Sequence, residues 1–354
     1  MNAALTARPA PVPPSAAPAR PAVVTRVSEL IGHTPLLELC RTGDGSRLLL
    51  KLEMFNPMGT AKIRMARRMV LDAEARGELR PGGRIVESTS GNTGLGLAVM
   101  AAERGYAFTA VVDNHACADK LRAMRALGTE LVYVTDDGTD DLATAAREEL
   151  AESLARGQDN TIFTEQHNNP SNGVGYAAVA HELHDALDGR VDVLVAAVGT
   201  GGALCGTARE LRRLVPEVRT VGVEPKGSVA FGGPAHDYYQ SGTGTPEGAG
   251  IGALVDFSLI DEGVKVGDVE AFATCRAVAR TGLLIGGSAG GVVHEALRLL
   301  PSLPPGSTMV ALINDGGEKY LDTVFDDDWM AARDLLDPVV EREIGDLLAT
   351  LRGR

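Results

Sequence analysis

Aromatic residues and positive charge are scarce in this chain of 354 residues. Aromatic side chains make up 4% of the sequence, with a single tryptophan, and the formal net charge is −13 at a pI of about 5.1. A nucleic-acid-binding surface needs a basic footprint, so this charge argues against nucleic acid as a partner. No apolar run approaches the ~20 residues of a membrane-spanning helix, so no contact with a membrane is expected.

Cysteine is also rare, and no two cysteines form a CxxC pair. Cys40, Cys117, Cys205 and Cys275 lie far apart in the sequence. This spacing is typical of reduced thiols in a cytoplasmic protein. Residues 1–22 are rich in Ala and Pro and lack the apolar core of a signal peptide. We expect a disordered tail there, with a transit peptide as the weaker alternative.

Glycine, in contrast, is abundant, with 42 residues, and the chain is long enough for roughly two domains. Apolar runs that read as strands, such as residues 82–88, 106–113 and 191–199, alternate with stretches of helical periodicity, such as 61–77. This alternation predicts an α/β fold with mostly parallel sheets flanked by helices. Residues 191–199 contain too few polar side chains for an edge strand, so we expect a central strand there.

Three glycine-rich turns follow predicted strands, at residues 90–94, 199–202 and 286–290. Ligands of open α/β sheets bind beyond the carboxyl ends of the strands. Gly199-Thr200-Gly201-Gly202 precedes a helix and offers backbone N–H groups to an anion. The turn Thr89-Ser90-Gly91-Asn92-Thr93 offers hydroxyl and amide groups to a carboxylate, although the same residues could merely cap a helix.

Lys62 stands at the start of a predicted helix, where the positive end of the helix dipole disfavours a cation. Taken alone it could be an ordinary surface lysine. Its context is more specific, because a set of motifs occurs together in one order. They are NP-x-G-T-x-K at 56–62, E-x-TSGNTG-x-GLA at 87–98, QHNNPSN at 166–172, GTGG at 199–202, GVEP at 222–225, GIGA at 250–253, GGSAG at 286–290 and DGGEKYLDTVF at 315–325.

From about residue 28 to 330, this set resembles the pyridoxal-phosphate enzymes of the cysteine synthase and cystathionine β-synthase family. The resemblance implies fold type II, with two α/β domains and pyridoxal 5′-phosphate as the cofactor. It implies a smaller domain of residues 23–33 and 56–165 with a mobile part near 111–134. The larger domain would comprise 34–55 and 166–330, followed by a helical tail at 331–354. Family members are usually homodimers, so we expect a homodimer.

The resemblance also implies roles for individual residues. Lys62 would form the Schiff base with the cofactor and act as the general base. Asn92 would contact the ring hydroxyl, and Ser288 the pyridine nitrogen. The cofactor phosphate would lie in the loop formed by Gly199, Thr200, Gly201, Gly202 and Ala203. The substrate carboxylate would be bound by Thr89, Ser90, Gly91, Asn92, Thr93 and Gln166. No metal site is expected.

The implied reaction is a β-replacement, in which an activated L-serine yields an aminoacrylate that a nucleophile attacks. The donor can be O-acetyl- or O-phospho-L-serine, and the nucleophile a sulfide, a thiol or an amine. ESTSGN, residues 226–232 and YLDTVFDDDWM resemble the branch that makes N-(2-amino-2-carboxyethyl)-L-glutamate, a precursor of 2,3-diaminopropionate. A serine or threonine dehydratase, and a non-catalytic binding protein that kept the fold, are the alternatives.

Three positions depart from the usual cysteine synthase pattern. Ile63 follows the lysine where the family usually has Asp, Ala203 stands where a phosphate-binding Thr is usual, and Ser88 replaces a common Pro. The loop at 236–250 matches neither branch. His236, Tyr238 and Tyr239 are therefore candidates for substrate contacts or, equally, for ordinary packing within the loop.

Overall fold

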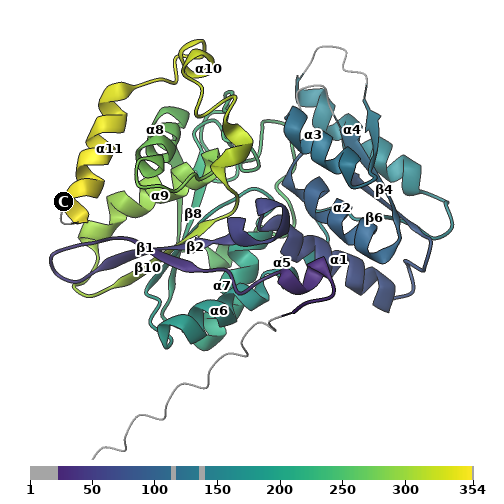
Figure 1. Cartoon of the computed structure of the whole chain (residues 1–354), viewed down its shortest axis with the longest axis horizontal. Helices are drawn as coiled ribbons and strands as arrows, with labels where there is room; N and C mark the ends of the chain where they lie inside the picture. Colours follow the sequence, from purple (N-terminus) through teal and green to yellow (C-terminus); the bar gives the residue numbers. More distant parts are fainter. Residues whose placement is uncertain (1–22, 113–116, 135–139, 353–354) are drawn as a thin grey trace, which may run out of the picture.

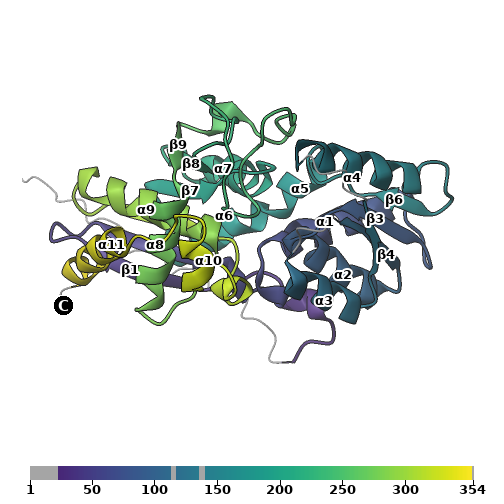
Figure 2. The same ribbon diagram turned by 90° about the horizontal axis from the view of Figure 1, so that it is seen from above.

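The computed structural model of the protein describes residues 23–112, 117–134 and 140–352. The strands in these ranges form two sheets that lie side by side, with α1 (Lys62–Ala75) and α5 (Pro170–Gly175) between them (Figures 1 and 2). The predicted tail at 1–22 lies outside the described residues, as does part of the predicted mobile segment, at 113–116.

The larger sheet has six strands in the order β1-β2-β10-β7-β8-β9. All neighbours pair in parallel except β1 and β2. Residues of β7 alternate between two apolar cores. Val193 and Val195 pack with α8 and α9 on one face, whereas Leu194 and Ala196 pack with α6 and α7 on the other. The predicted central strand is therefore confirmed. The strands are β1 (Leu36–Arg41), β2 (Arg47–Leu52), β7 (Val193–Ala197), β8 (Arg219–Pro225), β9 (Glu262–Val266) and β10 (Thr308–Ile313).

The smaller sheet has four parallel strands in the order β5-β4-β3-β6. One face packs against α1 and α2, and Ala151 of α4 packs on Val86 and Val111 of the other. The strands are β3 (Arg84–Ser88), β4 (Ala107–Val112), β5 (Glu130–Tyr133) and β6 (Thr161–Phe163), and the helices around them are α2 (Asn92–Arg104), α3 (Ala118–Ala126) and α4 (Asp140–Ala155).

The other helices cover the larger sheet and its ends. The α-helices are α6 (Ala177–Leu187), α7 (Gly202–Leu214), α8 (Asp268–Ala279), α9 (Gly287–Leu299), α10 (Asp327–Ala331) and α11 (Pro338–Leu351). The 3-10 helices are η1 (Val27–Leu30), η2 (Glu53–Phe55), η3 (Pro57–Gly59), η4 (Phe257–Leu259), η5 (Leu300–Ser302) and η6 (Gly317–Tyr320). No helix among the described residues is long and apolar enough to cross a membrane.

Ile63 is explained by the packing of α1 against α2. Its side chain is fully buried in the apolar core. A Cβ atom at Gly96 would lie 3.0 Å from the Cα of Ile63, so a glycine on α2 lets the two helices approach closely here. A carboxylate in place of Ile63 would lose its hydration at this contact, which makes an apolar residue the better fit.

The predicted division into domains is compatible with the sheets. The strands of the smaller sheet all fall within 56–165, and those of the larger sheet within 34–55 and 166–330. The tail contains α11, which packs against α8 at the outer edge of the larger sheet (Figure 1). The exact domain boundaries stay a prediction.

Candidate active site

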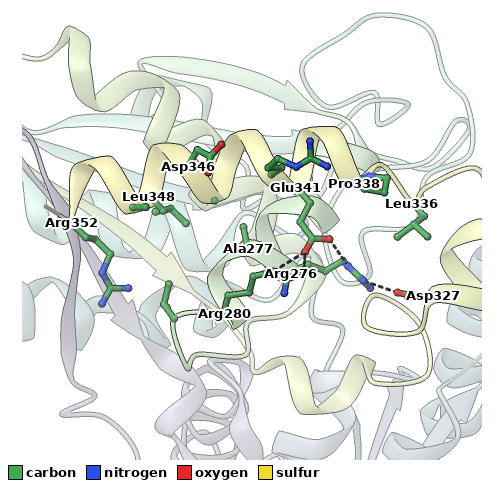
Figure 3. A pocket seen from close by; sticks show the side chains of 14 residues that line it. Arg276, Ala277, Arg280, Asp327, Leu336, Pro338, Glu341, Asp346, Leu348 and Arg352 are labelled. Atoms are coloured by element: carbon green, nitrogen blue, oxygen red, sulfur yellow. Dashed lines mark hydrogen bonds and ion pairs between the residues drawn. The ribbon is translucent and has the colours of Figure 1, made fainter. Parts of the chain in front are cut away.

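Two cavities are considered as the active site, and the larger of the two is a poor candidate. It has a volume of about 630 Å³ and lies between α8 and α11. Figure 3 shows Glu341 pointing between Arg276 and Arg280. Nε of each arginine donates to this carboxylate, at 2.9 and 3.0 Å respectively. None of the predicted site residues lines this cavity. Its central charges are already paired, so we assign it a structural role.

The smaller cavity, of about 280 Å³, collects the motif residues. It lies at the carboxyl ends of β3, β6, β7 and β10, where open α/β sheets bind their ligands. The predicted site residues that line it are Lys62, Thr89, Ser90, Gly91, Asn92, Thr93, Gln166, Gly199, Thr200, Gly201, Ala203 and Ser288. Gly202 is the exception, because it is buried as the first residue of α7 behind this wall.

Lys62 begins α1 and is held there by the end of β10. The backbone N–H of Ala61 donates to the carbonyl of Asn314 at 2.8 Å, and the N–H of Lys62 to Oγ1 of Thr60 at 3.1 Å. Burial lowers the pKa of the Lys62 amine to about 8, although the nearby Glu87 opposes this shift. At pH 7 about a tenth of the amine is therefore neutral, far more than for a lysine in water, and the neutral form is the one that a nucleophile or general base requires.

Glu87, at the end of β3, is a buried acid that the sequence did not single out. Its side chain is 1% exposed, and Oγ1 of Thr164 donates to its Oε2 at 2.6 Å. Burial raises its pKa to about 8. The group is thus mostly protonated at neutral pH, which avoids a full negative charge beneath the cavity.

The turn at 89–93 is folded by its own side chains. Oγ1 of Thr89 accepts hydrogen bonds from the backbone N–H groups of Gly91 and Gly94, at 3.3 and 3.2 Å. Oγ1 of Thr93 donates to Oε1 of Gln166 at 2.7 Å, which joins this turn to the segment after β6. The structure thereby brings Gln166, 73 residues further along the chain, to the predicted carboxylate cradle.

The loop at 199–203 requires glycine for a geometric reason. Gly201 has φ +83°, and a Cβ atom on it would lie 2.7 Å from the backbone nitrogen of Val255. The loop leads directly into the first turn of α7, whose leading N–H groups have no partner within the helix. The N–H of Gly202 donates to Oγ1 of Thr200 at 3.4 Å. The positive end of the helix dipole and the N–H groups of this first turn together suit a phosphate.

Asn92 of α2 and Ser288 of α9 line the cavity from helices that pack on different sheets, and Asp315 lines it beside them. Nδ2 of Asn92 and the hydroxyl of Tyr320 both donate to Oδ2 of Asp315, at 2.7 and 2.6 Å. An amide nitrogen carries two donors, so Asn92 keeps one for a ligand. Oδ1 of Asp315 is buried without a hydrogen-bond partner among the described residues, which marks a place where a polar ligand group would be favourable.

Several cavity residues were missed from the sequence. Asp315 belongs to a quoted motif but carried no predicted role, and Lys120 carried no signal of its own. The loop after β8 reaches the cavity through Ser241, Gly242, Thr243 and Gly244. His236, Tyr238 and Tyr239 are not part of the cavity lining. Tyr239 instead packs edge-on against Trp329 of α10, with ring centroids 5.6 Å apart. This is a packing contact, but with a residue outside the loop and not within it as the second alternative expected.

Comparison with known proteins decides the family. The model of the family described as "Pyridoxal-phosphate dependent enzyme" matches residues 27–315. The chain belongs to this family. The resemblance inferred from the motifs, the α/β fold of type II and the cofactor pyridoxal phosphate are thereby confirmed.

Relatives with assigned names point to the cysteine synthase type. A "Putative cysteine synthase" of Sinorhizobium fredii is 48% identical over 322 residues, which cover 90% of this chain and 96% of the relative. An N-(2-amino-2-carboxyethyl)-L-glutamate synthase of Ralstonia nicotianae is 36% identical over 318 residues, which cover 87% of this chain and 92% of the relative. The crystal structure of an O-acetylserine-dependent cystathionine β-synthase from Helicobacter pylori has 29% identity and a TM-score of 0.77, covering 85% of this chain and 98% of that one.

The residues of the cavity fit pyridoxal phosphate. Lys62 supplies an amine of lowered pKa, the loop at 199–202 supplies a phosphate cradle, and the buried Oδ1 of Asp315 lacks a partner. Ser288 lies at the first turn of α9 as a neutral hydroxyl on the same wall. Ala203 adds no hydroxyl, so a phosphate bound in this loop would depend on Thr200 and the backbone. In the described residues no cluster of three or more His, Cys, Asp or Glu could hold a metal ion.

Proposed function

We propose that this enzyme catalyses β-replacement on an activated L-serine, O-acetyl- or O-phospho-L-serine, with a sulfide, a thiol or an amine as nucleophile. The observation that carries the proposal is the Lys62 amine of lowered pKa, placed in one cavity with the hydroxyl-rich turn at 89–93. The similarity to named synthases supports it.

Each group of residues has a proposed task. Bound pyridoxal phosphate supplies the electron sink that makes the Cα–H bond of an amino acid acidic. Lys62 accepts the proton from Cα, and acetate or phosphate leaves with the electron pair of the Cβ–O bond. The nucleophile then bonds to Cβ and gives up its own proton, and Lys62 returns a proton to Cα, so the net change is exchange of the β-substituent. Thr89, Ser90, Gly91, Asn92, Thr93 and Gln166 hold the α-carboxylate. Ser288 would hold the pyridine nitrogen of the cofactor, Asn92 its ring hydroxyl and residues 199–203 its phosphate.

The amine branch is the second candidate function. The relative from Ralstonia nicotianae is named as a synthase of an amine-derived product and is 36% identical over 318 residues. An amine such as L-glutamate would then replace sulfide as the nucleophile, and O-phospho-L-serine would be the donor. For the molecule as a whole we propose a cytoplasmic homodimer, supported by four free cysteines and by the family resemblance.

The proposal is tested by titrating the purified holoenzyme separately with O-acetyl-L-serine and O-phospho-L-serine and recording its absorption spectrum. We expect the cofactor band to shift with at least one donor and to return when a nucleophile is added. Sulfide and L-glutamate, offered in parallel, distinguish the two branches. Rapid formation of ammonia and a keto acid without any nucleophile would instead support a dehydratase, and a band that neither donor changes would refute the proposal.

A further inference from the structure

Lys120 is a buried lysine for which the described residues supply no carboxylate as a counter-ion. It lies on α3, its side chain is 4% exposed, and it lines the cavity of the proposed active site. Its Nζ lies 3.4 Å from the hydroxyl of Tyr320 and 4.7 Å from the centre of that ring. Among the residues that the structure describes, no carboxylate lies within 4.0 Å of this ammonium group.

Asp315, the acid that Tyr320 links to Lys120, already has partners. Oδ2 of Asp315 accepts from both Asn92 and Tyr320, so Tyr320 stands between the carboxylate and Lys120. A neutral hydroxyl and an aromatic ring solvate an ammonium group only in part. Burying a charge without a counter-ion is costly, so a buried unpaired cation on the wall of a ligand cavity points to an anion that arrives with the ligand.

The α-carboxylate of the substrate and a second anionic group would be bound by different parts of the cavity. In the proposed function, the turn at 89–93 and Gln166 hold the α-carboxylate with hydroxyl, amide and backbone groups. Lys120 comes from a different helix and adds a full positive charge to the same space. Other charged groups on the wall are Lys62 and Arg147, against Glu148 and Asp315. This charge is local, since the whole chain carries −13.

We propose that Lys120 binds a second anionic oxygen group of the substrates, distinct from the α-carboxylate. That group is either the phosphate of an O-phospho-L-serine donor or the distal carboxylate of an amino-acid nucleophile. The inference rests on the proposed function, because it assigns the chemistry of a substrate to the same site. It favours substrates with two anionic ends over the neutral side chain of O-acetyl-L-serine.

Three variants of the holoenzyme provide the test. Lys120→Met removes the charge and keeps the length, Lys120→Arg keeps the charge, and Arg122→Met removes a charge from the exposed face of the same helix. Arg122 is 68% exposed and pairs with Asp119, so it is a matched control outside the cavity. The cofactor band and the thermal midpoint of each variant report whether it is folded and loaded.

The first arm measures the donor concentration that half-saturates the spectral change. If Lys120 binds the phosphate of the donor, we expect Lys120→Met to raise this concentration about tenfold for O-phospho-L-serine and less than twofold for O-acetyl-L-serine. The second arm uses O-acetyl-L-serine as donor and compares L-glutamate with its neutral analogue L-glutamine. A rise of about tenfold in KM for L-glutamate alone would assign the anion to the nucleophile. In both arms the half-saturating concentration of Lys120→Arg should stay within about threefold of the wild-type value, and that of Arg122→Met should equal the wild-type value.

Two results would overturn the inference while the proposed function stands. One is an equal change, or none, for charged and neutral substrates in both arms. The other is loss of the cofactor band in Lys120→Met with recovery in Lys120→Arg, which would mean that Lys120 binds the cofactor and not a substrate. A wild-type protein that responds to neither donor would refute the proposed function itself, and the inference with it.

Discussion

At the scale of single residues, Lys62 owes its chemistry to its surroundings. A lysine in water is almost fully protonated at neutral pH, whereas burial brings this amine to a pKa of about 8. The positive end of α1 acts in the same direction. The unfavourable place of a cation at a helix start, visible in the sequence, is thus a means of obtaining a neutral amine.

Replacement of this lysine tests its role. We expect Lys62→Ala to lose turnover by about 10³-fold, because general-base and nucleophilic contributions of one side chain are of that order. Steady-state assays with the donor that shifts the cofactor band provide the measurement. Lys226→Ala, an exposed lysine paired with Glu270, is the control and should retain full turnover. A Lys62→Ala enzyme with wild-type turnover would exclude Lys62 as the catalytic base.

Glu87 allows a prediction on pH and stability. Its folded pKa is about 8, above the ordinary 4.5, so the folded protein holds an extra proton between these pH values. Stability therefore falls as pH rises from about 4.5 to 8. Glu87→Gln removes this loss while keeping an acceptor for Thr164, and its stability relative to wild type should rise across that window. The slope is at most about 1.4 kcal/mol per pH unit.

Urea unfolding at pH 5, 6, 7 and 8 measures this difference. The exposed Glu152→Gln variant on α4 is the control, for which we expect a difference below about 0.5 kcal/mol at each pH. A stability difference between Glu87→Gln and wild type that does not change with pH would mean that Glu87 is ionised in the folded protein.

The sequence predicts residues of the site when they lie in contiguous motifs. Lys62, the turn at 89–93 and the loop at 199–202 could be named because each chemical group is grouped with glycines in one short stretch. Lys120 and Glu87 could not, since their significance depends on burial and on partners such as Tyr320 and Thr164 that are remote in sequence. Desolvation is a property of the folded surroundings and has no local signature.

At the scale of elements, a buried ionic network ties α1 to the larger domain. Nε of Arg64 donates to Oε2 of Glu53 at 2.6 Å, and its Nη1 to Oε1 of Glu182 at 2.8 Å. Nζ of Lys51 donates to Oε2 of Glu182 at 2.6 Å. Burial would raise the pKa of Glu182, but Arg64 and Lys51 lower it to about 2. The network joins β2, η2, α1 and α6, two residues beyond Lys62.

Loss of Arg64 should therefore destabilise the whole protein. Arg64→Met leaves the buried Glu53 without its cation and the half-buried Glu182 with Lys51 alone. Breaking a buried pair from one side costs about 3–5 kcal/mol. The free energy of unfolding in urea measures the loss. Arg68→Met removes an exposed arginine from the same helix and should change it by less than about 0.5 kcal/mol. Equal effects of the two substitutions would contradict a structural role for the network.

Elements themselves were largely predictable, whereas this network was not. The alternation of apolar strands and helices in the sequence follows from the two buried faces of each parallel sheet, as in β7. Arg64 carried no such pattern, because it lies among residues of helical period and differs from its exposed neighbours Arg67 and Arg68 only in what it meets. A partner 118 residues away, Glu182, decides its role.

At the scale of the whole molecule, one apolar core runs through both domains. It contains Ile85 and Ala110 of the smaller sheet together with Leu194 and Leu312 of the larger one. Asn92 and Asp315 add a polar bond of 2.7 Å across the same junction. Two sheets that share a core are expected to unfold together, so heat should produce a single transition in spite of the division into domains.

The cofactor should shift that transition as a unit, because its proposed contacts come from both domains. A ligand bound only by the folded state stabilises it by about 2.7 kcal/mol at a concentration 100-fold above Kd, and each kcal/mol raises Tm by about 2–4 °C in a chain of more than 150 residues. We therefore expect pyridoxal phosphate to raise the Tm of the apoprotein by about 5–10 °C, and clearly less in Lys62→Ala, which lacks the covalent link. Calorimetry at fixed protein concentration is the measurement. Two transitions, of which the cofactor moves only one, would instead mean that a single domain provides the binding energy and that the shared core does not couple the sheets.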